Sequence, residues 1–153
     1  MKYIRLSHTL SSDTPSYGNS DQIIITPKTS ISKGATSNTS KWIFNNNHIG
    51  THLDVPFHFC DSGIKTTDIS IGTFFFNSVC VIDVPASGSH LINIKDIENN
   101  QTKLRDDIEL LLIRTGFEKF RSSADYWNNN PGLSSQLAEY FRSRFPKIKG
   151  VGF

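Results

Sequence analysis

The chain has 153 residues, of which 37% are hydrophobic and eleven are Phe, so we expect one domain, 1–153, with a real core. Sixteen Lys and Arg against fourteen Asp and Glu leave a formal charge of +2, too little for phosphate-dominated nucleic-acid binding. Neither a membrane span nor a secretion signal is recognisable, so we expect a cytoplasmic protein that binds neither membranes nor nucleic acid.

The first third of the chain is rich in strand signals. Residues 2–6 alternate polar and apolar side chains as a strand does, and the Ser, Asp, Pro and Gly of residues 11–18 predict a loop after it. Residues 22–26 and 41–44 are β-prone runs rich in Ile, Trp and Phe. Since Ser, Thr and Gly residues separate these two runs, we expect them to pair as antiparallel neighbours.

The middle of the chain predicts two central strands with a helix between them. Residues 79–84 and 109–114 are nearly continuous apolar runs, which are typical of strands covered on both faces. Between them, Asn93 can cap a short helix that places Ile94 and Ile97 on one side.

The last third predicts a helix and a final strand. Apolar residues recur at helical spacing from Ser134 until Pro146, which indicates about three turns. Residues 148–153 resemble the start of another buried strand. Because a strand at the centre of a sheet is an unusual place for a chain to stop, we expect a C-terminally truncated chain. Strands alternating with helices predict an α/β fold with a mixed sheet. The apolar positions of the helix are Leu137, Ala138, Tyr140, Phe141 and Phe145.

Several isolated residues have ordinary interpretations. Without a secretory context, Cys60 and Cys80 are expected to be reduced thiols, with Cys60 a small buried hydrophobe. His8 and His90 are expected to be surface or hydrogen-bonded histidines. The Asn run at 45–47 is expected to be a loop without a function.

Three of the five histidines fall within one segment, residues 48–59. In an extended chain, successive side chains point to opposite faces, so the polar and apolar positions would separate. We expect the apolar set to enter the core and the polar set to line a cavity. The polar set is His48, His52, Asp54 and His58, and the alternate positions are Ile49, Thr51, Leu53, Val55, Phe57 and Phe59.

A regular helix or strand cannot bring the first three polar residues to one ion. On a helix, Asp54 would lie about 240° from His48. On a flat strand, His48 and His52 would be about 13 Å apart, whereas ligands lie about 2 Å from a metal. The chain must therefore bend, and Gly50 can adopt the required dihedral angles while Pro56 fixes the exit.

Two imidazoles and a carboxylate suit a divalent metal, either Zn²⁺ or Mn²⁺, and also Fe²⁺. The ligands would be His48, His52 and Asp54, which leave a position open for water. Bound water can have a pKa of about 7 instead of about 15.7. His58 is then placed to move protons, and the alternative is a core histidine that bonds a backbone carbonyl.

The twelve residues of 48–59 resemble the H-x-G-T-H-x-D-x-P-x-H-F signature of the cyclase and kynurenine formamidase family, and every fixed position matches. Flanking segments also look like those of the family: 6–8 and 14–18 like its opening strand and loop, and 114–116, Tyr126 and 131–134 like its central strand, active-site loop and helix start.

This resemblance implies a swivelling β/β/α-type domain, usually a homo-oligomer, that hydrolyses an amide or lactam bond of a small-molecule substrate with a divalent metal. By resemblance, His48, His52 and Asp54 bind metal and His58 is the catalytic acid and base. A further His and Glu of the family lie in a region that would follow Phe153.

The first substrate expectation is an arylformamidase that converts N-formylkynurenine to kynurenine and formate. The alternatives are an isatin-type lactam hydrolase and a non-catalytic protein that binds metal or a small molecule. An aryl pocket could include Trp42, Phe57, Phe59 and Trp127, although core packing would also explain these aromatic residues.

Overall fold

A computed structural model describes residues 7–153 and divides the chain into two compact units, with the boundary between Asp61 and Ser62. The strand predicted for residues 2–6 lies outside the described residues. Parallel and antiparallel strand pairs both occur, in separate sheets, and helices alternate with the parallel strands. The expected α/β class with mixed strand directions is therefore confirmed.

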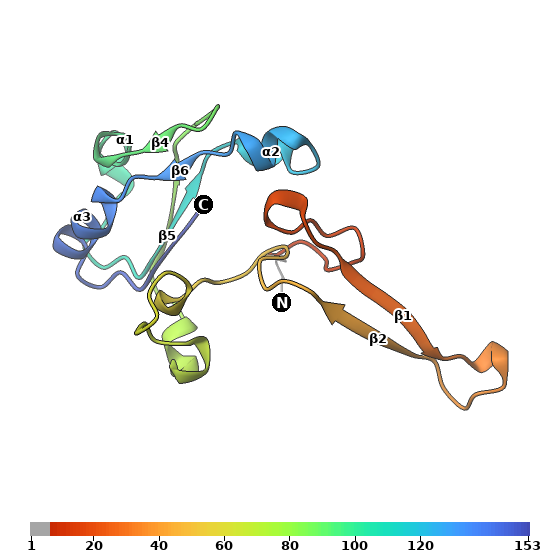
Figure 1. Cartoon of the computed structure of the whole chain (residues 1–153). Helices are drawn as coiled ribbons and strands as arrows, with labels where there is room; N and C mark the ends of the chain where they lie inside the picture. The colour runs from red at the N-terminus through yellow and green to blue at the C-terminus, as the bar shows by residue number, and fades with distance from the viewer. Residues whose placement is uncertain (1–6) are drawn as a thin grey trace, which may run out of the picture. The chain divides into compact units, whose positions relative to one another are not determined.

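The first unit is built around an antiparallel hairpin of β1 (Ile23–Thr29) and β2 (Thr39–Phe44), as the β-prone runs predicted (Figure 1). Cross-strand pairs such as Ile25 with Trp42 set its register. Short 3₁₀ helices lie in the connections of this unit: η1 (Tyr17–Asn19), η2 (Ile31–Lys33) and η3 (Pro56–His58).

Few apolar side chains are buried in the first unit. Within residues 7–61, the buried apolar residues are Ile23 and Ile49, and the buried polar residues are Thr14 and Ser16. Ser16 forms an antiparallel bridge with Ile49. The loop predicted at residues 11–18 is therefore the support on which the histidine-rich segment lies.

The second unit contains a three-stranded parallel sheet in the order β3-β5-β7. β3 (Val79–Asp83) and β5 (Leu110–Arg114) are the two apolar runs, and β7 (Gly150–Gly152) confirms the final strand. The crossovers contain a smaller parallel pair and three helices: β4 (Leu91–Ile92), β6 (Gly132–Leu133), α1 (Ile94–Glu98), α2 (Ala124–Asn128) and α3 (Gln136–Arg144). The remaining 3₁₀ helices are η4 (Thr66–Asp68), η5 (Ile71–Phe74), η6 (Gln101–Lys103) and η7 (Phe117–Phe120).

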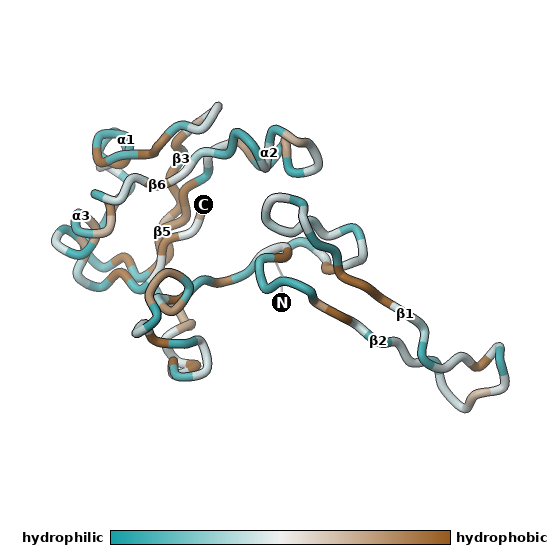
Figure 2. The backbone as a smooth tube through the Cα atoms, in the orientation of Figure 1, coloured by the Kyte–Doolittle hydropathy of each residue, from teal (hydrophilic) through white to brown (hydrophobic). Residues whose placement is uncertain are grey.

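Hydrophobic residues follow β3 and β5 along most of their length (Figure 2). The core of this unit is formed on one face of the sheet, where Ile82 and Leu111 pack against residues of α1 and α3. On the other face, Val81 is 48% exposed and Leu112 is 36% exposed. Coverage on both faces was therefore predicted wrongly, because both helices of the core lie on the same face.

The helices α1 and α3 follow their sequence signals. Asn93 caps α1 through a hydrogen bond from the Lys95 amide to its Oδ1 at 2.9 Å, and Ile97 is buried. α3 ends at Arg144, just before the predicted stop. Ala138 is exposed, contrary to expectation, because it lies about 100° around the helix from the buried Leu137.

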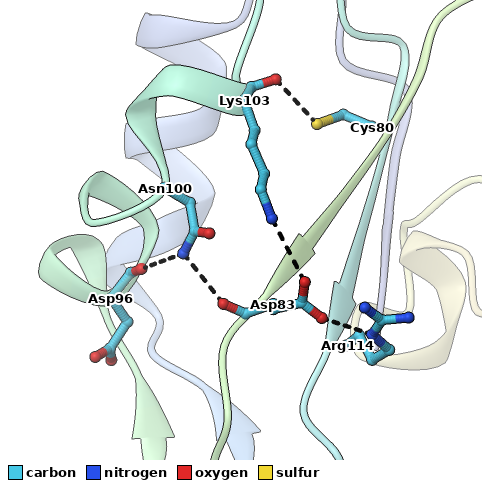
Figure 3. A network of polar contacts seen from close by, with 6 residues as sticks. All are labelled: Cys80, Asp83, Asp96, Asn100, Lys103 and Arg114. Atoms are coloured by element: carbon cyan, nitrogen blue, oxygen red, sulfur yellow. Dashed lines mark hydrogen bonds and ion pairs between the residues drawn. The ribbon is translucent and has the colours of Figure 1, made fainter.

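A polar network joins the ends of β3 and β5 to the crossover between them (Figure 3). The Arg114 guanidinium donates to Asp83 Oδ1 at 2.5 Å, and Lys103 Nζ lies 3.4 Å from Oδ2. Asn100 Nδ2 donates to the Asp83 carbonyl at 3.2 Å. The buried Cys80 is a free thiol, as expected, and donates to the Lys103 carbonyl at 3.3 Å. Across residues 7–153, every helix is too short or too polar to cross a membrane.

Candidate metal site

The chain bends at Gly50, between His48 and His52, as the spacing predicted. Gly50 has a φ of 67°, in the left-handed region that side chains disfavour. A Cβ atom at this position would lie 2.9 Å from Thr14 Cγ2, which is too close for real contacts. The Gly50 amide also donates to the Pro15 carbonyl at 3.1 Å. The bend is therefore held in place by the supporting loop.

The ends of the bent segment are also fixed. The Tyr17 amide donates to the His48 carbonyl at 2.8 Å, and the neighbouring Ile49 is buried. At the other end, Pro56 begins η3 directly after Val55, whose backbone is extended. Proline suits the first position of such a turn because it has no amide hydrogen to satisfy.

Three predicted ligand atoms converge within this unit. The Nδ1 of His48 lies 2.8 Å from the Nε2 of His52. The Oδ1 of Asp54 lies 3.6 Å from the His48 nitrogen and 3.7 Å from the His52 nitrogen. Residues that are up to six positions apart in sequence therefore present three donors to one point.

The donor set fits a divalent cation. In a tetrahedral site with ligands at about 2.0–2.2 Å, neighbouring ligand atoms are about 3.3–3.6 Å apart. Both Asp54 separations are close to that range. The 2.8 Å between His48 Nδ1 and His52 Nε2 is a hydrogen-bond distance. To bind one ion, these two nitrogens would have to move apart by less than about one ångström, which a small change of side-chain rotamer provides. Nitrogen and oxygen donors suit Zn²⁺ and Mn²⁺.

A backbone carbonyl orients one of the rings. His52 Nδ1 lies 2.8 Å from the Gly50 oxygen, and a carbonyl can only accept, so Nδ1 carries the hydrogen. The Nε2 of His52 is then the nitrogen with a lone pair, directed at His48. Ligating histidines commonly bind a carbonyl through the second nitrogen in this way. Gly50 therefore supplies both the bend and the orienting acceptor.

His58 lies in the same cluster. His48, Asp54 and His58 each offer one ligand atom, and these atoms lie within 4.8 Å of one another. The His48 and His58 ring centroids are 4.3 Å apart. His58 is exposed, so the alternative of a core histidine is wrong. This position suits a proton carrier beside the ligands and also a fourth ligand.

The apolar positions of the motif do not form a core face. Ile49 is buried, whereas Leu53 is 54% exposed and Phe59 is 88% exposed. The alternation fails because the chain after the bend is irregular and then forms η3, so it is not an extended strand. The thiol of Cys60 is exposed, and its prediction as a buried hydrophobe is therefore also wrong.

The aromatic residues divide between the two units. Trp42, Phe57 and Phe59 are exposed, so core packing does not explain them. The ring of Trp42 stacks on Phe44 with centroids 6.3 Å apart. Trp127 belongs to the second unit, where it contacts Tyr126.

Two isolated histidines behave as predicted. His8 is exposed on the surface. His90 lies 3.0 Å from an oxygen of Asp96, so it is a hydrogen-bonded histidine of the second unit.

One contact of the site was missed from the sequence. The His48 amide donates to Asn46 Oδ1 at 2.7 Å, although the Asn run was expected to be without function. The available signal was an Asn two positions before a ligand, which is the spacing of a side-chain-to-backbone turn.

The chain is similar to a known protein family and to several known proteins. The Cyclase family model matches residues 4–153. The chain is 32% identical to an uncharacterized protein of Haemophilus influenzae over 108 residues, which cover 69% of this chain and 75% of that protein.

It is also 31% identical to the kynurenine formamidase of Bacillus cereus (ATCC 10987) over 104 residues, or 68% of this chain. The match spans 46% of that enzyme, which is less than half of its length. Isatin hydrolase A of Labrenzia aggregata has a similar fold, with a TM-score of 0.78 and 21% identity over 97% of this chain and 65% of the hydrolase.

Proposed function

Because this chain belongs to the Cyclase family, whose model spans nearly all of it, we propose that it is a metal-dependent hydrolase of an amide or lactam C–N bond. The observation that carries the proposal is the convergence of His48, His52 and Asp54 on one point. Kynurenine formamidase and isatin hydrolase, to which the chain is similar, support a hydrolase.

The metal would be held by His48 Nδ1, His52 Nε2 and Asp54 Oδ1. A divalent cation in such a site polarises a carbonyl and lowers the pKa of water to about 7. The chain's own contribution is to hold three donors together and to keep the proton of His52 on Nδ1, against the Gly50 carbonyl. This arrangement leaves the Nε2 lone pair available as a ligand.

His58 is the proposed acid and base. Its ring lies beside His48 and is accessible to solvent, so its imidazole can take a proton from water and return it to the leaving nitrogen. Positioned acids and bases typically contribute about 10² to 10⁴ in rate.

The proposed substrate is an aryl formamide, with N-formylkynurenine as the first choice because a kynurenine formamidase is 31% identical. Its hydrolysis would give kynurenine and formate. An isatin-like lactam is the second choice, supported by the fold of isatin hydrolase A.

A non-catalytic metal-binding protein is a second candidate function. The observation in its favour is the exposure of the site, since the side chain of Asp54 is 46% exposed and that of His52 is 31% exposed. Efficient hydrolases generally exclude bulk water around the reacting groups. Assembly as a homo-oligomer and residence in the cytoplasm stay predictions from the sequence.

The test is a parallel assay of metal content and turnover. The chain is loaded with Mn²⁺ or Zn²⁺, and formate release from N-formylkynurenine is followed beside ring opening of isatin. Hydrolysis that disappears in His58→Ala but persists in His8→Ala supports the enzyme. Stoichiometric metal without turnover of either substrate would favour the binding protein.

A further inference from the structure

The side chain of Asn46 binds the backbone of a proposed metal ligand. Its Oδ1 accepts the His48 amide hydrogen at 2.7 Å. A side chain that accepts from the amide two residues later closes a small turn and restricts the backbone dihedrals between the two residues. Asn46 therefore limits where the Cα of His48, and so its ring, can lie.

The amide of the same side chain is tied to the supporting loop. Asn46 Nδ2 donates to Asp21 Oδ2 at 3.2 Å. The Asp21 amide in turn donates to Ser16 Oγ at 2.9 Å, and Ser16 is 1% exposed. A continuous chain of hydrogen bonds thus joins His48 to one of the most buried residues of its unit.

The backbone of His48 is held at both of its polar groups. Its amide donates to Asn46, and its carbonyl accepts from the Tyr17 amide at 2.8 Å. Tyr17 follows Ser16 directly, so both restraints lead back to the same loop. Fixing a ligand's backbone on two sides is a means of preorganising a site before its ion binds.

The neighbouring asparagines provide an internal comparison. Asn45 and Asn47 are both exposed, whereas Asn46 is half-buried. Within residues 7–153, the structure gives neither neighbour a side-chain hydrogen bond. The three residues are identical in type, and the side-chain hydrogen bonds distinguish Asn46 from the other two.

We propose that Asn46, linked to Asp21, is a positioning residue that fixes His48 for metal binding. The inference rests on the proposed metal site. Outer contacts of this kind typically change metal affinity by about 10-fold to 100-fold when they are removed. Asn46→Ala should therefore weaken Mn²⁺ or Zn²⁺ binding by about that factor, through loss of ligand placement and not of a ligand.

The experiment measures the dissociation constants of Mn²⁺ and Zn²⁺ by isothermal titration calorimetry. Asn47→Ala is the matched control and should bind within about twofold of wild type, as expected for an exposed side chain without a hydrogen bond. Asn46→Ser keeps an oxygen that can accept from the His48 amide and should recover part of the loss.

A reciprocal exchange tests the link to Asp21. Asn46→Asp alone places two carboxylates side by side, so the contact is lost. Combining it with Asp21→Asn restores one donor and one acceptor with the same net charge as wild type, and should recover most of the affinity. Amide hydrogen exchange should become faster at His48 in Asn46→Ala while Gly50, whose amide bonds Pro15, stays protected.

The inference is overturned if the wild-type chain binds both metals and Asn46→Ala binds them as tightly as Asn47→Ala does. It is also overturned if His48 exchange is unchanged. A wild-type chain that binds neither metal would instead remove the proposed site, and the positioning role with it.

Discussion

The Nδ1 of His48 and the Nε2 of His52 lie 2.8 Å apart, at hydrogen-bond distance. Because His52 keeps its own hydrogen on Nδ1 toward Gly50, the hydrogen in this pair comes from His48. An ion bound between the two rings would need the His48 hydrogen to leave Nδ1, for example to Nε2, so that two metal–nitrogen bonds can replace this hydrogen bond. The pair is therefore the part of the site that changes most when a metal binds.

His52→Ala should abolish stoichiometric metal while leaving the fold largely intact. The ring is 31% exposed and its partners are site residues, so its loss removes a ligand without opening the core. Elemental analysis and circular dichroism of the purified variant measure the two effects. His8→Ala is the control, and a His52→Ala protein with normal metal content would contradict the proposed ligand set.

His58→Ala should keep its metal and lose about 10² to 10⁴ in turnover, because His58 is assigned to proton transfer. Metal content and formate release are measured on the same sample. Loss of both together would place His58 among the ligands, which its distance from Asp54 allows. Unchanged turnover would exclude it as the acid and base.

Gly50→Ala should destabilise the protein by more than about 2 kcal/mol and weaken metal binding. A left-handed backbone costs a side chain about 1–2 kcal/mol, and the new Cβ also meets Thr14 at 2.9 Å. Gly34→Ala is the matched control, since its φ of 86° is strained but no atom lies within 4 Å. Urea unfolding compares the two, and equal losses would show that the contact with Thr14 is unimportant.

The Asp83–Arg114 pair should make stability depend on pH in the acid range. The hydrogen bond from Arg114 lowers the pKa of the Asp83 carboxyl below its ordinary value of 3.8. A lowered folded pKa adds stability above the ordinary pKa, and this contribution is lost as pH falls through the folded value.

Wild type should therefore be more stable than Asp83→Asn at pH 7, and the difference should shrink below about pH 4. Thermal unfolding between about pH 2 and pH 7, a range that spans the ordinary carboxyl pKa, checks this. Because the pair is exposed, 1 M salt, at which the screening length is about 3 Å, should reduce the same difference. A difference that is constant with pH would contradict the assignment.

Neighbouring residues of β3 should respond differently to truncation. Ile82 is fully buried, so Ile82→Ala should cost about 2–5 kcal/mol. Val81 is 48% exposed on the opposite face, and Val81→Ala should cost less than about 1 kcal/mol. Denaturant unfolding measures both. A large loss in Val81→Ala would mean that a further surface covers this face in solution.

Much of the local structure follows from residues that are close together along the chain. The β-prone runs became β1 and β2, and the apolar runs became β3 and β5, because strand formation depends on side chains that are adjacent along the chain. Asn93 and Pro146 marked helix ends for the same local reason. The need for a bend at Gly50 followed from ligand spacing alone.

Which faces are covered, and which contacts hold the site, depends instead on long-range packing. Val81 and Phe59 are apolar residues that were expected to be covered, yet both are exposed, because burial depends on whether another element packs on that side. Asn46 could not be distinguished from Asn45, since its partner Asp21 is 25 positions away along the chain. Long-range pairing of this kind is set by how the loop and the histidine-rich segment fold together, which residue types alone do not specify.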